Sequence, residues 1–157
     1  MDEIENQTAE FEHADAVDVV VLFTCHCFTH SFTRDVRTPL EISSDEIYEN
    51  DVERRVLSKE RYELSRRFLP KLVKDLPKRA IRYAGDNSLN YFTAEVTGTK
   101  TPGVYAVFFE VLRDKRRKRR LLPYVQSAYR LERLTNRLAK GGKVRFATLL
   151  RKAYHAQ

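Results

Sequence analysis

The sequence is short of the residues that mark disulfide-stabilised and metal-binding proteins. It contains no Trp, one Met and only two Cys, Cys25 and Cys27, among 157 residues. A spacing of two residues suits an intrachain disulfide poorly, and no second Cys pair is present to complete a structural zinc site with His26 and His30. We therefore predict reduced thiols that act as small apolar side chains, no metal or other cofactor, and a cytoplasmic protein of bacterial or phage type.

Long apolar runs and enzyme signature motifs are also missing. The longest apolar stretch, AVDVVVLFTCHCF at 16–28, is interrupted by Asp18 and is too short to span a membrane. Its upstream flank is acidic, which does not suit a secretory signal. We therefore predict that the protein has no membrane partner. The sequence also contains no Walker loop, no zinc-protease helix motif, no nucleophile elbow and no paired acidic metal site.

Charge is distributed unevenly along the chain. Lys and Arg number 29 against 22 Asp and Glu, yet residues 1–18 hold seven acidic residues and no Lys or Arg. The remainder is therefore strongly basic, which is typical of proteins that bind polyanions. We predict an acidic flexible tail over 1–15, either solvated or folded back on a basic surface. The length suits one hydrophobic core, so residues 16–157 are expected to form a single domain.

The first half of the chain predicts a strand followed by a helix. Residues 16–28 are rich in β-branched and aromatic residues and indicate a buried strand. Residues 29–57 have no clean period and are expected to be mostly loop, with a short turn of helix or strand. Apolar residues recur at helical spacing over 58–79, with Ser58 as the cap, and Pro70 should either kink this helix or divide it into a pair.

The second half predicts a sheet and a terminal helix. Four strand patterns lie at 79–84, 89–96, 104–112 and 121–131. Pro123 argues that the last strand starts late or lies at an edge. Residues 132–142 permit a short helix that Gly141 and Gly142 would end, and a terminal helix should follow. The predicted fold is α+β, an antiparallel meander of about four to five strands packed against the kinked helix (or helix pair) and the C-terminal helix.

The strongest functional signal is the segment RDKRRKRR at 113–120, between two predicted strands. Seven of its eight residues are basic. Folding does not need such a concentration of like charges, but a polyphosphate would relieve their repulsion, and Arg suits bidentate phosphate contact. If the predicted helix shares a face with this segment, the two form one basic groove. The predicted nucleic-acid-binding residues are Arg113, Lys115, Arg116, Arg117, Lys118, Arg119, Arg120, Arg66, Arg67 and Lys71.

Three residues are candidates for catalysis without a metal. A ribonuclease of this kind needs a base for the ribose 2′-hydroxyl, an acid for the leaving oxygen and a cation for the charge that develops on the phosphoryl group. His26 can act as base or acid, and Arg130 can supply the cation beside Tyr129 at a strand end. The predicted catalytic residues are therefore Tyr129, Arg130 and His26. Tyr129 is also a candidate for stacking on an exposed base.

Two stretches, YAVFFEVLRD at 105–114 and LLPYVQSAYR at 121–130, resemble the core hairpin of the RelE/ParE toxin fold. The order of elements over 58–155 is similar as well. The resemblance implies ribosome-dependent mRNA cleavage, as in RelE-like toxins, or inhibition of gyrase, as in ParE-like toxins. Arg120, Tyr129 and Arg130 would be the nearest counterparts of the functional residues. The chain departs from the family in its length, its acidic leader and its Cys-rich first strand, and it is also similar to uncharacterised short proteins of bacterial chromosomes and mobile elements.

Two hypotheses follow from these patterns. The first is a basic nucleic-acid-binding protein, with RNA or another polyanion as its ligand, that acts as a metal-independent endoribonuclease of the toxin type. The alternative is a non-catalytic protein-binding module of a mobile element that blocks or regulates a host complex. Its partner would be an acidic protein, either an antitoxin or part of the host complex.

Overall fold

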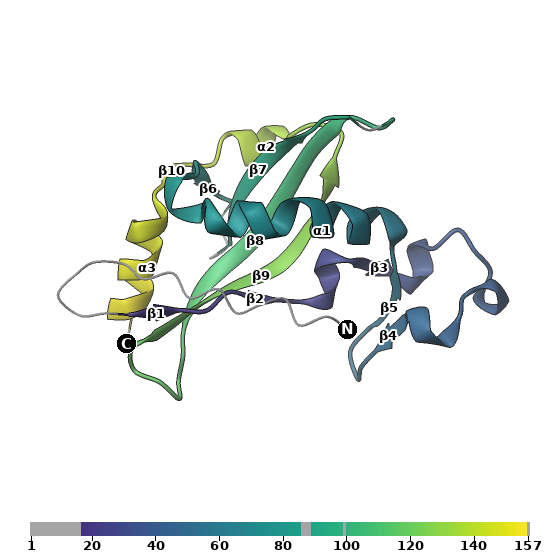
Figure 1. Ribbon diagram of the computed structural model, residues 1–157, viewed down its shortest axis with the longest axis horizontal. Helices are drawn as coiled ribbons and strands as arrows, with labels where there is room; N and C mark the ends of the chain where they lie inside the picture. Colours follow the sequence, from purple (N-terminus) through teal and green to yellow (C-terminus); the bar gives the residue numbers. More distant parts are fainter. Residues whose placement is uncertain (1–16, 86–88, 99, 157) are drawn as a thin grey trace.

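The computed structural model describes residues 17–85, 89–98 and 100–156, which form an α+β fold (Figure 1). A mixed sheet of seven strands is covered on one face by α1 (Lys59–Lys74) and α3 (Phe146–His155). The predicted fold class is therefore confirmed. The predicted acidic tail over 1–15 lies outside the described residues. No helix in the described part of the chain combines the length and the apolar character needed to cross a membrane.

The meander forms from four consecutive strands, each antiparallel to the next. They are β6 (Ile81–Tyr83), β7 (Asn90–Val96), β8 (Gly103–Arg113) and β9 (Arg120–Leu131). In β8, Tyr105, Val107 and Phe109 face the helices, whereas Ala106 and Phe108 face the opposite side of the sheet. Because both faces of β8 are covered, its apolar residues form a nearly continuous run rather than a strict alternation with polar residues.

The strand that borders β9 is divided in two where it passes Pro123. β1 (Asp18–Val19) and β2 (Leu22–Phe23) both pair parallel with β9. Residues 122 and 123 of β9 pair with neither of these two short strands. Proline has no N–H to donate to a neighbouring strand, so the ladder stops beside it. The expected late start or edge position of this strand is therefore wrong: β9 begins at Arg120 and lies inside the sheet, and the strand beside it is interrupted instead.

The N-terminal third differs from the prediction in two places. The expected strand over 16–28 ends at Phe23, and Cys25–Cys27 forms the short 3-10 helix η1. Thr24 caps it, because its hydroxyl accepts a hydrogen bond from the His26 N–H at 3.2 Å, and such local bonds compete with strand pairing. The expected loop over 29–57 contains a second sheet of three strands, β3 (Thr29–Ser31), β4 (Ile47–Glu49) and β5 (Arg54–Leu57).

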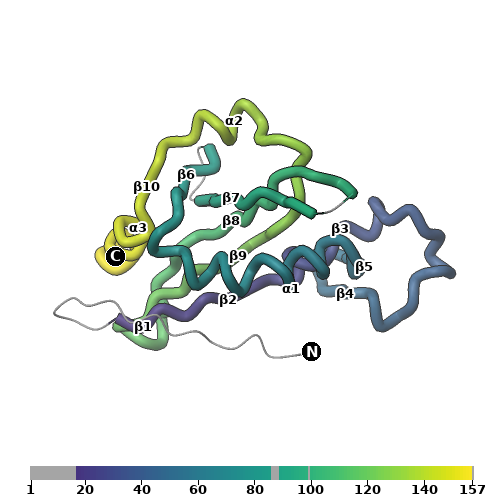
Figure 2. The backbone as a smooth tube through the Cα atoms, turned by 45° about the horizontal axis from the view of Figure 1, so that its top comes forward, coloured from purple at the N-terminus to yellow at the C-terminus, as the bar shows by residue number. Residues whose placement is uncertain are grey.

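The segment 32–53, here called the arm, projects from one end of the molecule (Figures 1 and 2). It contains β4 and three 3-10 helices, η2 (Phe32–Arg34), η3 (Pro39–Glu41) and η4 (Ser44–Glu46). Asp35 holds the arm together by accepting hydrogen bonds from Arg37 Nε at 3.0 Å and from the His30 ring at 2.8 Å. Arg37 and His30 thereby lower the pKa of Asp35 below its ordinary value. Arg37 also donates to Glu46 at 2.8 Å, so the arm is cross-linked by charged groups.

α1 is a single helix that contains Pro70, so of the two alternatives left open the structure has one helix rather than a pair. Ser58 caps its start by accepting a hydrogen bond from the Arg61 N–H at 3.4 Å, as predicted. The helix ends at Lys74, earlier than expected, and the 3-10 helix η5 (Leu76–Lys78) follows.

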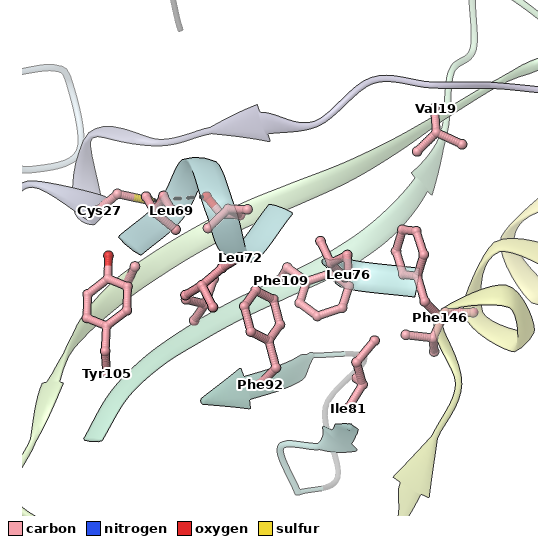
Figure 3. Close-up of a cluster of buried hydrophobic side chains, with 14 of the residues drawn as sticks. Val19, Cys27, Leu69, Leu72, Leu76, Ile81, Phe92, Tyr105, Phe109 and Phe146 are labelled. Atoms are coloured by element: carbon pink, nitrogen blue, oxygen red, sulfur yellow. Dashed lines mark hydrogen bonds between the residues drawn. The ribbon is translucent and has the colours of Figure 1, made fainter. Parts of the chain in front are cut away.

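The main core lies between the sheet and the two helices, and Figure 3 shows its centre. Leu69 and Leu72 from α1 and Leu76 from η5 point toward the aromatic side chains of the sheet. Phe109 is completely buried, with its ring centroid 5.7 Å from that of Phe92. Burial of these side chains supplies most of the driving force for packing the helices on the sheet.

A smaller core covers the opposite face of the sheet. Tyr91, Ala106 and Phe108 are its buried members. The chain between β9 and α3 passes over them and includes α2 (Asn136–Ala139) and β10 (Lys143–Val144), with Leu134 and Leu138 packed against the cluster. The rings of Tyr91, Phe108 and Tyr129 form a stacked row across three strands.

Candidate functional site

The basic segment 113–120, here called the tip, forms an ordered turn at the end of the β8–β9 hairpin. The Asp114 N–H donates to the Arg120 carbonyl at 3.0 Å, and the Arg120 N–H donates to the Arg117 carbonyl at 3.0 Å. The Arg116 N–H donates to the Asp114 carboxylate at 2.8 Å, an Asx-type turn bond. The acidic residue in this basic segment therefore shapes the turn.

The cations of the tip are largely exposed to solvent. Arg113 and residues 115–119 are exposed, and Arg120 is half-buried and pairs with Asp114 at 3.8 Å. In the part of the chain that the structure describes, no carboxylate lies within ion-pairing distance of Lys115, Arg116, Arg117 or Lys118. The positive charge of these four side chains is therefore available to a ligand.

The base of the tip is fastened to the C-terminal helix. Arg113 donates to the Ala156 carbonyl at 3.4 Å, and its guanidinium lies 5.8 Å from the centre of the Tyr154 ring. Because Tyr154 lies in the last turn of α3 and Ala156 caps its end, these contacts hold the first residue of the tip against a packed helix. These contacts therefore fix the base of the tip, from which the cations at 115–119 project.

The predicted binding residues of the helix lie elsewhere. Arg66, Arg67 and Lys71 are exposed on the outer side of α1, and Arg67 donates to the Thr97 carbonyl at 2.9 Å. In both Figure 1 and Figure 2, α1 crosses the middle of the sheet, whereas the tip extends beyond its end beside β1 and α3. The tip and these helix residues thus lie on different elements, and the single basic groove expected from the sequence stays a prediction.

Two of the predicted catalytic residues lie beside one arginine, Arg61. The Tyr129 ring stacks on Phe108 with centroids 5.5 Å apart, and the Arg61 guanidinium lies over the Tyr129 ring at 4.9 Å from its centre. Arg61 also donates to the carbonyls of His26 at 3.2 Å and of Thr29 at 2.8 Å. The His26 ring itself is hydrogen-bonded to Glu53, with Nε2 and Oε1 2.5 Å apart. Tyr129 and His26 are therefore linked through Arg61, with the His26 ring engaged by a carboxylate.

Arg130, the third predicted catalytic residue, lies on the other face of the sheet. It is in register with Tyr105, which belongs to the main core, and neighbouring residues of a strand point to opposite faces. Its Nε donates to Glu60 at the start of α1 at 2.8 Å. The structure therefore connects the Tyr129 ring to the His26 backbone through Arg61, and it places Arg130 on the other face of the sheet.

The two cysteines have different surroundings, and both are free thiols. Cys27 is buried in the main core, and burial raises its pKa to about 12. Cys25 lines an open pocket of about 420 Å³ together with Ile47, Tyr48, Glu49, Asn50, Glu53 and Arg55. Over the described residues, no group of three or more His, Cys, Asp or Glu side chains is placed to hold a metal ion.

Comparison with known proteins assigns the chain to a family. The family model described as the YjaZ family matches residues 3–154, nearly the whole chain. The chain belongs to the YjaZ family. The curated Protein YjaZ of Escherichia coli (strain K12) is 28% identical to this chain over 129 residues, which cover 82% of this chain and 66% of the relative. The chain thus spans slightly less than two thirds of the length of that relative. No solved structure matches.

Sequence reasoning missed Arg61, which contacts both sheets of this YjaZ family chain. Its guanidinium lies over Tyr129 of the main sheet and donates to the Thr29 carbonyl of the second sheet. Its partners lie far away along the chain; Thr29, for example, is 32 positions distant. Burial lowers the pKa of the Arg61 guanidinium, and the nearby charge of Arg55 adds to this effect. The only local signal was the cap at Ser58, which places Arg61 in the first turn of α1 but does not identify its partners.

Replacing Arg61 with Ala should lower the free energy of unfolding by about 2–3 kcal/mol, because two hydrogen bonds from a charged group and one cation–π contact are lost. Urea denaturation followed by circular dichroism measures this. Arg66→Ala is the matched control on the same helix, since Arg66 is exposed, and it should change stability by less than about 0.5 kcal/mol. Equal effects of the two substitutions would show that Arg61 does not join the second sheet to the main one.

Proposed function

We propose that this YjaZ family protein binds RNA through the tip and that it does so in the cytoplasm. The single observation that carries the proposal is the set of exposed cations at 115–118, for which the described residues provide no carboxylate partner. A nucleic acid chain supplies phosphates that can neutralise them and releases its condensed counterions in doing so. The ordered turn supports the proposal further, because a fixed tip loses less conformational freedom on binding than a flexible one.

The proposal assigns the affinity to phosphates rather than to stacked bases. Tyr91 and Tyr105 are 1% and 0% exposed, so neither ring is accessible to a base. Tyr129 has Phe108 against it and Arg61 over it. Contacts of cationic side chains with phosphates carry little sequence information, and we expect the protein to discriminate weakly between RNA sequences.

The proposal covers binding and not cleavage. Cleavage without a metal needs a base, an acid and a cation at one phosphate. Tyr129 and His26 lie near Arg61, and the His26 ring is held by Glu53. Arg130 lies on the other face of the sheet and pairs with Glu60. The toxin-type activity that the RelE/ParE resemblance implies therefore stays a prediction.

The test is the salt dependence of RNA binding, measured by fluorescence anisotropy with a labelled RNA. If six or more phosphates are contacted, the affinity should fall by about a thousandfold or more between about 50 and about 200 mM salt. Replacing Lys115, Arg116, Arg117 and Lys118 together with Gln should reduce the slope of log affinity against log salt by about 3, because each lost phosphate contact contributes about 0.7–0.9.

A second quadruple substitution serves as the control. Arg133, Lys140, Lys143 and Arg145 are exposed and lie around α2 and β10, on the side of the molecule away from the tip (Figure 1). Their replacement with Gln removes the same charge and should leave most of the slope intact. If both variants lose the same slope, or if the wild-type protein binds RNA without salt dependence, the tip is not the binding site.

A further inference from the structure

The arm differs in charge from the rest of the described chain. Residues 32–53 contain seven acidic residues and two arginines, in a protein with 29 Lys and Arg in total. One of these arginines, Arg37, is already paired within the arm with Asp35 and Glu46. Three exposed carboxylates, those of Glu41, Asp45 and Asp51, have no Lys or Arg within ion-pairing distance among the described residues. The arm therefore presents negative charge outward.

The arm also exposes large apolar side chains. Val36 is 100% exposed, Leu40 is 99% exposed and Val52 is 91% exposed. These are the most exposed large hydrophobic residues of the described chain, and all three lie next to acidic residues. Aliphatic side chains surrounded by charge of one sign are typical of a surface that is covered by a partner of opposite charge.

The arm keeps its shape and its charge without that partner. The Asp35–Arg37–Glu46 network cross-links it, and the Thr38 N–H donates to the Glu41 carboxylate at 2.6 Å. The Thr38 N–H lowers the pKa of Glu41, and the Ser43 hydroxyl lowers that of Asp45, so both carboxylates stay ionised well below neutral pH. An ordered surface of this kind loses little freedom when it docks.

The tip has the complementary properties at the other end of the molecule. Its exposed cations follow Leu112, which is 41% exposed at the end of β8. In both views the arm lies at one end of the molecule and the tip at the opposite end (Figures 1 and 2). The long axis of the chain thus runs from an acidic, apolar end to a basic end that also exposes a leucine.

We propose that two copies of this chain associate side by side in opposite directions, with the arm of each copy docked on the tip of the other. An antiparallel arrangement forms the arm–tip contact twice. It is closed by a two-fold axis, the symmetry that most homodimers use. Docking covers Val36 and Leu40 against Leu112, and it places the carboxylates of the arm beside the unpaired cations of the tip. The interface does not require RNA, and because it covers the cations at 115–118, dimer formation and RNA binding at the tip compete.

The experiment is a charge swap followed by analytical ultracentrifugation at low salt. The arm variant carries Glu41→Lys, Asp45→Lys and Asp51→Lys, and the tip variant carries Lys115→Glu, Arg116→Glu and Arg117→Glu. The wild-type protein should dimerise, and each variant alone should dimerise at least about tenfold more weakly, since its arm and tip then have the same sign. An equimolar mixture of the two variants should dimerise again, because each arm then faces a tip of opposite charge.

The outcomes separate this inference from the proposed function. Recovery in the mixture, with both variants folded by circular dichroism, supports the interface. A wild-type protein that stays monomeric at low salt, or a mixture of folded variants that does not associate, overturns it. Val36→Ser with Leu40→Ser changes no charge and should also weaken the dimer; if the arm variant does not fold, an unchanged dimer in this second variant overturns the proposal. RNA binding by a monomeric wild-type protein would leave the proposed function intact while the interface fails.

Discussion

Replacement of Phe109 with Ala is expected to lower the free energy of unfolding by about 3–5 kcal/mol. Phe109 is 0% exposed at the centre of the main core, where its ring meets Phe92 and lies 6.4 Å from that of Phe146. Truncation removes the apolar area that these contacts bury and leaves a cavity between the sheet and α3. The surrounding side chains come from several elements, so they cannot close the cavity without moving a helix or a strand.

Chemical denaturation in urea, followed by circular dichroism, measures this loss. Leu112→Ala, measured at a protein concentration low enough to keep the chain monomeric, is the control in the same strand, because Leu112 is 41% exposed and its truncation should change stability by less than about 1 kcal/mol. The slope of the transition should stay the same in both variants, since the surface exposed on unfolding hardly changes. If Phe109→Ala is no more destabilising than Leu112→Ala, the core described here is wrong.

The protein is also expected to lose stability steeply in alkaline solution because of Cys27. Burial raises the pKa of this thiol from 9.0 to about 12 in the folded protein. Above pH 9 the unfolded chain releases the thiol proton, whereas the folded chain keeps it until about pH 12. The unfolded state therefore binds fewer protons in this window, and stability falls as pH rises, by about 1.4 kcal/mol per pH unit from this one group. Below pH 9 the contribution of Cys27 is fully present.

The comparison of wild type with Cys27→Ala isolates this effect. Burial raises the pKa values of Tyr105 and Tyr91 as well, so the wild-type slope contains more than one group. Unfolding free energies measured at several pH values between 9 and 12 should fall less steeply in Cys27→Ala than in the wild type. Parallel slopes in the two proteins would mean that Cys27 loses its proton at the same pH in the folded and unfolded states.

The sequence predicted the elements whose signals are local. Alternating and continuous apolar runs identified β7, β8 and β9 within a few residues, and the Ser58 cap identified the start of α1. The second sheet was missed because β3, β4 and β5 are three or four residues long, too short to show a period. The apolar composition of 16–28 predicts a strand through Cys25–Cys27. The prediction is wrong there because the cap formed by Thr24 favours a 3-10 turn.

The functional residues divide in the same way: those marked by a local pattern could be predicted, and those that depend on contacts between distant segments could not. The tip was recognisable because its charges are consecutive in the chain and any hairpin would expose them. The relation between Tyr129, His26 and Arg61 depends on three segments that meet only in the folded protein. The separation of Arg130 from Tyr129 follows from the alternation of side chains along a strand, and it could have been expected once β9 was assigned. The acidic residues of the arm are visible in the sequence. Their projection from the molecule depends on the second sheet, which the sequence did not predict.

The interruption beside Pro123 also protects the fold against misalignment. A parallel strand that slid along β9 would bring a paired carbonyl to the one position that has no N–H to offer, and an unpaired buried carbonyl is unfavourable by roughly 1–3 kcal/mol. In the native alignment only the gap between β1 and β2 faces that position. The proline therefore disfavours any displaced N-terminal strand that would run past it without a break.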